Sequence, residues 1–145
     1  MLHPELKALI ESGEVNVGDK VWICDYRFDD PTNKPMRNIA PQQVFIMDNS
    51  STKKRVYYSD FYFAPISAKG TPLATVIAPF DNTGFRGYTG VSVGIFLQEK
   101  DCRDYFVKQC EEARKKIEKA RDEFTKKMNE RIEEATVLQN IHANT

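Results

Sequence analysis

Arginine side chains among aromatic rings are the groups in this sequence best suited to hold a ligand. Arg27 stands between Tyr26 and Phe28, and Asp29 and Asp30 follow at once. A guanidinium held in place by a neighbouring carboxylate is a good receptor for a small anion. The alternative is an ordinary surface ion pair, which contributes only ~0–1 kcal/mol. Both interpretations remain open from the sequence.

A glycine-rich segment, Pro79–Gly90, is the second place where chemistry is expected. Glycines leave backbone N–H groups approachable, as loops that hold phosphates require. Phe85 and Tyr88 can stack on a base, Arg86 can pair with a phosphate, and Asn82 can bond a ribose or a base edge. The commoner use of such a segment is a hairpin loop whose rings cap the core.

Two further arginines belong with these clusters. Arg37 follows Arg27 by ten residues, and Arg103 opens a long helical segment, where acidic groups are preferred. A cation in that first turn suggests a partner such as a phosphate, which is also drawn to helix N-termini. The three arginine clusters together predict one pocket for a small nucleotide-like molecule.

Catalytic and metal-binding patterns are missing from the sequence. The cysteines Cys24, Cys102 and Cys110 have no paired spacing, and the two histidines, His3 and His142, lie near the ends of the sequence. A zinc site needs closely spaced Cys and His ligands. A Ser-His or Cys-His mechanism would have to recruit its histidine from a chain end, where order is usually low. We therefore expect no enzyme and no cofactor, although carboxylate catalysis stays open. The odd cysteine count is typical of reduced, intracellular thiols.

Charge is balanced overall and uneven in its distribution. The 145 residues carry 21 basic and 21 acidic side chains, which argues against a polyanion partner or extended nucleic acid. Residues 1–98 hold 13 of the 16 aromatic residues and 10 charges of each sign, whereas residues 99–145 hold 11 of each. No apolar run is long enough to span a bilayer, and no secretion signal opens the chain, so we expect an intracellular protein.

The periodicity predicts an α+β fold made of a body, residues 1–98, and a helical region, residues 99–145, which form one structural unit. A short helix is expected over residues 4–12, because Pro4 suits a first helical position and Gly13 ends it. Asp25–Pro41 is expected to be a polar loop. A twisted antiparallel sheet of about five strands is predicted from runs of β-branched and aromatic residues. The first run ends near residue 24, and the other four cover residues 43–47, 56–63, 74–78 and 91–97.

From residue 99 the period becomes that of a helix of nearly 40 residues. Its apolar stripe is Phe106, Cys110, Ala113, Ile117, Ala120, Phe124, Met128, Ile132 and Ala135. At 1.5 Å per residue it would be roughly 55–60 Å long, more than the body can cover. We expect the stripe to pack on a second copy. The alternatives are a break near Asp122–Met128 that folds the helix back, or a frayed end after residue 130.

The strand end Ile23–Arg27, the loop Pro79–Arg86 and the terminal helix together resemble the phage Thoeris anti-defence sponges of the first-described type. The resemblance implies an intracellular phage protein that sequesters cyclic ADP-ribose isomers, without cleaving them, in pockets between paired subunits. It also implies dimers or hexamers, some of which hold cyclic oligonucleotides. The ligand residues implied by matching positions are Arg27, Phe85, Arg86 and Arg103, with Trp22 and Asn82 as weaker candidates.

Three other functions compete with sequestration. A small barrel with a protruding helix can serve as a protein-interaction module that inhibits a host protein. The basic run Lys53–Arg55 and the exposed aromatic residues would suit a nucleic-acid-binding barrel, which the zero net charge disfavours. An enzyme acting on a nucleotide is the remaining alternative. Recovery of an unchanged ligand would exclude it.

Overall fold

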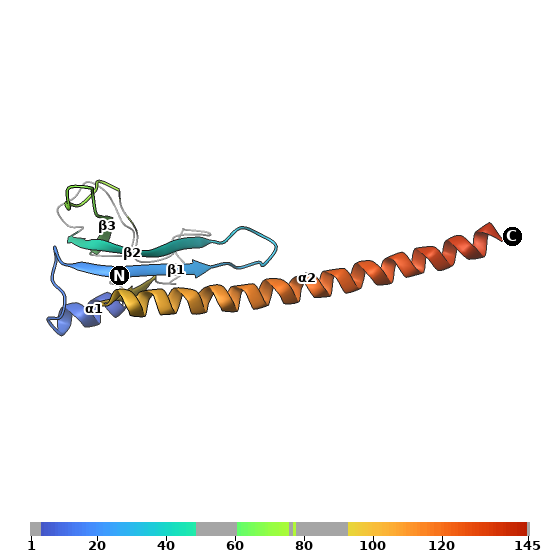
Figure 1. Cartoon of the computed structure of the whole chain (residues 1–145), viewed down its shortest axis with the longest axis horizontal. Helices are drawn as coiled ribbons and strands as arrows, with labels where there is room; N and C mark the ends of the chain where they lie inside the picture. The colour runs from blue at the N-terminus through green and yellow to red at the C-terminus, as the bar shows by residue number, and fades with distance from the viewer. Residues whose placement is uncertain (1–3, 49–60, 76, 78–92, 145) are drawn as a thin grey trace.

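The computed structural model describes residues 4–48, 61–75, 77 and 93–144. Its elements in chain order are α1 (Pro4–Glu11), β1 (Lys20–Arg27), β2 (Arg37–Asp48), β3 (Phe61–Pro65), β4 (Gly94–Phe96) and α2 (Glu99–Ala143). Figure 1 shows α2 running along the strands and then far beyond them. The α+β class, the short N-terminal helix, the antiparallel sheet and the long C-terminal helix are confirmed.

The sheet has the strand order β3-β2-β1-β4, with every described pairing antiparallel. Four strands are described, where about five were predicted. In the expected strand at residues 74–78, residues 76 and 78 lie outside the described residues, and Ile77 forms an isolated antiparallel bridge with Phe63. Most of the predicted strand 56–63 lies outside the described residues.

The prediction of a polar loop over Asp25–Pro41 was wrong. β1 continues to Arg27 and β2 already begins at Arg37, so the connection is shorter. The register shifts between Ile23 and Asp25, which leaves one more residue on β2 than on β1 and places Pro41 in a β-bulge. Proline is accepted at a bulge because no ladder hydrogen bond is required of its nitrogen there.

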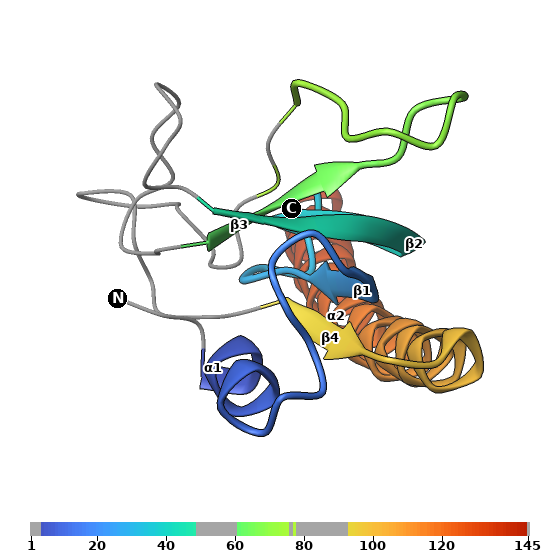
Figure 2. The same cartoon turned by 90° about the vertical axis from the view of Figure 1, so that its left-hand side faces the viewer.

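The two faces of β1 have different partners. Val21 and Ile23 are fully buried in the main core, together with Val15, Val44, Ile46, Phe63, Val93 and Ile95. Leu9 and Ile10 of α1 pack against this core, and Gly13, with a φ of 76°, ends that helix. The alternate residues of β1 face α2, which lies on one side of the strands in Figure 2. The strand therefore joins the core to the helix.

α2 is one helix of 45 residues with no break, so the predicted alternatives of a fold-back near Asp122–Met128 and a frayed end after residue 130 were wrong. The stretch has no internal glycine or proline, and ion pairs four residues apart support its first half. Neither described helix is both long and apolar enough to cross a lipid bilayer.

Candidate functional site

A buried carboxylate shared by two arginines is the centre of the candidate site. Asp25 is fully buried near the end of β1. Its Oδ2 lies 3.1 Å from Nη1 of Arg37 and 3.4 Å from Nε of Arg27. The Arg37 side chain is 10% exposed and the Arg27 side chain 35% exposed, so Arg27 is the more accessible of the two cations. These three side chains are two guanidinium groups and one carboxylate.

Strand geometry explains why these three residues meet. Asp25 and Arg27 are two residues apart on β1, so their side chains leave the same face of the sheet. Arg37 is the cross-strand partner of Arg27 in the register of β1 and β2. Two cations directly opposite each other repel, and Asp25 is the counter-ion that makes the pair tolerable.

The sequence suggested that Asp29 or Asp30 would hold Arg27, and the structure assigns that role to Asp25. The extra strand residues carry Asp29 and Asp30 into the connection between β1 and β2. Oδ1 of Asp30 accepts hydrogen bonds from the backbone N–H of Thr32 (2.9 Å) and from its hydroxyl (2.8 Å). These local bonds lower the pKa of Asp30, with the backbone N–H as the larger cause.

Gln109 of α2 connects the helix to the site and was missed by the sequence analysis. Its Nε2 donates to Oδ1 of Asp25 at 2.9 Å, and its Oε1 accepts from the backbone N–H of Tyr26 at 3.0 Å. β4 pairs with β1 only as far as Cys24, so the amide of Gln109 satisfies the strand edge just beyond β4. A lone glutamine next to an apolar stripe carries no sequence signal for this role.

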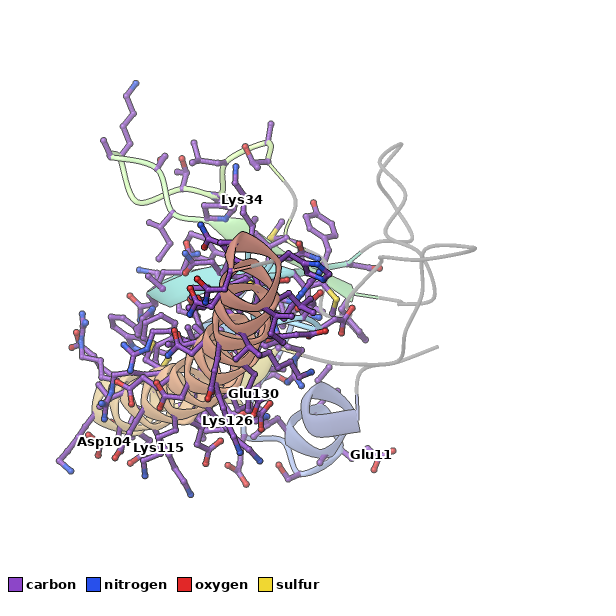
Figure 3. The ribbon with its side chains drawn as sticks, turned by 90° about the vertical axis from the view of Figure 1, so that its right-hand side faces the viewer. Glu11, Lys34, Asp104, Lys115, Lys126 and Glu130 are labelled. Atoms are coloured by element: carbon purple, nitrogen blue, oxygen red, sulfur yellow. The ribbon has the colours of Figure 1, made fainter. Side chains whose placement is uncertain are left out.

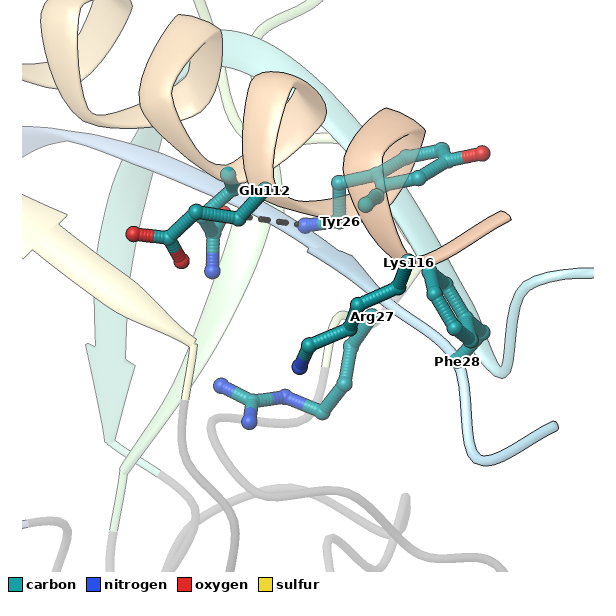
Figure 4. Close-up of a pocket in the computed structure, with 7 residues that line it drawn as sticks. Tyr26, Arg27, Phe28, Glu112 and Lys116 are labelled. Atoms are coloured by element: carbon teal, nitrogen blue, oxygen red, sulfur yellow. Dashed lines mark hydrogen bonds between the residues drawn. The ribbon is translucent and has the colours of Figure 1, made fainter. Parts of the chain in front are cut away.

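A pocket of about 150 Å³ opens beside this cluster (Figure 4). Tyr26, Arg27 and Phe28 line it from the end of β1, and Gln109, Glu112, Ala113 and Lys116 line it from α2. In Figure 4 the cationic ends of Arg27 and Lys116 extend to the same side of the pocket. The pocket thus combines cations with aromatic rings, the chemistry that suits a phosphate attached to a flat group.

An apolar groove follows α2 away from this pocket. Its first part, of about 300 Å³, is lined by Tyr26, Cys110, Ala113, Arg114, Ile117 and Glu118. Its second part, of about 290 Å³, shares Ile117 and adds Pro31, Thr32, Ala120, Arg121 and Phe124. The groove therefore runs from the end of β1 along the predicted stripe of α2.

The described candidates Trp22 and Arg103 form a separate group. The Arg103 guanidinium lies 5.9 Å from the centre of the Trp22 ring, and its Nη2 lies 2.9 Å from Glu99. Trp22 is five residues before Arg27 on β1, which corresponds to roughly 16 Å along a strand. Within one chain Arg103 therefore lies apart from the Asp25 cluster, next to Glu99 of its own helix and the Trp22 ring, and its ligand role stays a prediction.

The glycine-loop candidates Asn82, Phe85, Arg86 and Tyr88 lie outside the described residues. Their roles stay predictions from the sequence, as does the ligand role of the described candidates. Within the described ranges, no group of three or more His, Cys, Asp or Glu side chains is placed to hold a metal ion.

Two of the three cysteines lie between β1 and α2. Cys24 and Cys102 are fully buried, and Sγ of Cys24 donates to the backbone oxygen of Cys102 at 3.4 Å. Burial is the main cause that raises the pKa of both thiols, and for Cys24 the hydrogen bond with Cys102 adds to it. Both are therefore neutral packing groups at physiological pH.

Comparisons with known proteins do not assign the chain to a family. No family model, no curated protein and no solved structure matches it.

Proposed function

We propose that the protein binds and sequesters a small cyclic nucleotide without altering it. The ligand class is that of the cyclic ADP-ribose isomers used as immune signals, and the outcome is a block of bacterial anti-phage defence from within the host cytoplasm. The observation that carries the proposal is the pair Arg27 and Arg37 sharing the single carboxylate of Asp25 beside a pocket lined by aromatic rings.

The charge arrangement supports an anionic ligand. Asp25 presents one carboxylate to two guanidinium groups, and Arg37 is largely enclosed, so Arg27 is the cation that a ligand can reach. Arg27 holds Asp25 through Nε, which leaves its terminal nitrogens directed toward the pocket in Figure 4. Guanidinium groups bind phosphates in a bidentate manner, and the rings of Tyr26 and Phe28 offer faces for a base.

The size of the pocket supports a site shared between subunits. Binding sites for small molecules typically measure ~300–1,000 Å³, and this pocket measures about 150 Å³. A second subunit laid against its open side would complete the enclosure. The proposal therefore includes a homo-oligomer, a dimer or a hexamer, and neither a membrane nor extended nucleic acid as partner.

Isothermal titration calorimetry with purified cyclic ADP-ribose isomers tests the proposal. We expect saturable binding to the unaltered protein and at least a tenfold loss of affinity in Arg27→Ala, because a charge-assisted contact is worth ~1.5–3 kcal/mol. Arg114→Ala is the matched control, because Arg114 is an exposed arginine of α2 that pairs with Glu118. Its affinity should equal that of the unaltered protein.

The same titration separates the two described arginine groups. If the ligand lies at the Asp25 cluster, the Arg103→Ala variant should bind it with unchanged affinity. A loss of affinity in Arg103→Ala alone would show that the ligand binds beside Trp22 instead. Ligand released by denaturing the complex should have its original mass. A hydrolysed product, or no binding of any isomer, would refute sequestration.

A further inference from the structure

The second half of α2 carries an apolar face that the body does not cover. We call Phe124, Met128, Ile132, Ala135 and Leu138 the distal stripe. Phe124 and Ile132 are each 63% exposed and Leu138 is 50% exposed. Figure 1 shows this part of α2 beyond the end of the sheet.

The distal stripe continues the face with which α2 packs on the sheet. Cys102 and Ala113 are buried on that face, Phe106 and Cys110 are half-buried, and steps of three or four residues lead from there through Ile117 to Phe124. Such steps return to the same side of a helix. The face therefore has an intramolecular partner over its first half only.

The charges of the uncovered half are divided by sign. Residues 119–128 contain four basic and two acidic side chains, a net charge of +2. Residues 129–143 contain one basic and three acidic side chains, a net charge of −2 with His142 neutral. Two copies laid antiparallel set each positive part against a negative part, whereas a parallel pair sets like against like.

We infer that a second copy of this chain covers the distal stripe, with the two α2 helices antiparallel over residues 119–143. That overlap of 25 residues is about 38 Å long, enough for more than three heptads of helix pairing. The two bodies then lie at opposite ends of the pair. This inference rests on the self-association included in the proposed function and is independent of the ligand.

The arrangement also brings the second copy to the pocket. In an antiparallel overlap, the C-terminal turn of the second copy lies beside residues 119–120, about one helical turn from Lys116 at the rim. The second subunit then closes the pocket with the C-terminal end of its α2 helix and not with its sheet. This geometry deepens the proposed site by naming the segment that encloses it.

Analytical ultracentrifugation of the protein without nucleotide tests whether the stripe is the contact. Leu138→Asp places a charge on the stripe, and we expect the dimer dissociation constant to rise at least tenfold. Val137→Asp is the matched control, because Val137 is its neighbour, is 51% exposed and lies off the stripe. An unaltered chain that stays monomeric, or equal effects of the two variants, would overturn the inference.

Spin-label distances test the orientation. With Cys110→Ser as background, single labels are placed at Lys119→Cys and at Lys126→Cys, both exposed positions of α2; Figure 3 shows Lys126 on the side of α2 away from the sheet. Both positions lie on the same side of residue 131, the centre of the overlap, so in an antiparallel pair moving the label by these seven residues changes the separation of the two labels along the helix axis by about 20 Å. An unchanged distance would show a parallel pair and overturn the proposal. Because no nucleotide is present, these outcomes are separate from the calorimetric test.

Discussion

At the scale of residues, the Asp25 cluster shows how one buried carboxylate organises two cations. Asp25 accepts from Gln109 through one oxygen and faces Arg27 and Arg37 with the other. Removing one partner of a buried ionic network leaves a buried charge without its counter-charge. The resulting loss of folding stability is larger than the net stabilisation that the intact network provides. Asp25 thus supports the strand pairing and the proposed binding site at the same time.

This role leads to a stability prediction. Asp25→Ala should lower the free energy of unfolding by about 3 kcal/mol, because Arg27 and Arg37 would lose the buried carboxylate that both of them face. Chemical denaturation followed by circular dichroism measures the change. Asp29→Ala is the control, since Asp29 is exposed and a surface substitution is usually within about 0.5 kcal/mol. Equal losses in the two variants would contradict the assignment of Asp25 as the shared partner.

At the scale of elements, β1 is the segment on which the other parts depend. It pairs with β2 and β4, its one face enters the main core, and its other face packs on α2. Gly94 of β4 fits this packing closely, because a Cβ there would lie 2.9 Å from the Phe96 ring and 3.1 Å from the Tyr105 ring. The junction of β1, β4 and α2 is therefore tight.

The thiols buried at the junction of β1 and α2 predict a pH dependence. Burial raises the pKa of Cys24 and Cys102, so the folded chain keeps both protons where the unfolded chain loses them. The folded state then binds more protons, and stability falls as the pH rises above about 9. Urea titrations between pH 7 and pH 10 measure this fall.

Two cysteine variants test the source of that dependence. Cys24→Ala should show a smaller fall in stability with pH, and Cys110→Ser should keep the fall of the unaltered chain. In native protein a thiol reagent should modify Cys110 before the two buried residues. Rapid modification of all three thiols at neutral pH would contradict the burial of Cys24 and Cys102.

At the scale of the whole molecule, the body and the far half of α2 have different sources of stability. The core of the body is built from residues before Glu99, with Cys102 and Ala113 added by α2. A chain ending at Ala120 should therefore keep its sheet, lose close to half of its helical signal, and sediment as a monomer. Circular dichroism and sedimentation measure these three properties. Loss of the sheet in this variant would show that the far half of α2 stabilises the body.

Much of the architecture could be predicted from the sequence, because periodicity is a local property. Proline at the start and glycine at the end bounded α1, and the uninterrupted apolar period from Phe106 predicted α2. The ends of the strands were harder to predict from the sequence. The polar and proline-containing segment after Asp25 predicts a loop by composition, yet the pairing with β2 and the bulge at Pro41 extend both strands into it.

The sequence by itself determined that arginines and aromatic residues gather near Arg27 and that a long apolar stripe follows one helix. Only the tertiary structure decided which groups meet: Asp25 with Arg27 and Arg37, Gln109 with the strand edge, and Arg103 with Trp22 instead of the pocket. The physical reason is that residue types and their periodicity are local properties of the sequence. Ion-pair partners depend instead on strand register and on how a helix lies across a sheet. A shift of one residue in that register would turn Asp25 to the opposite face.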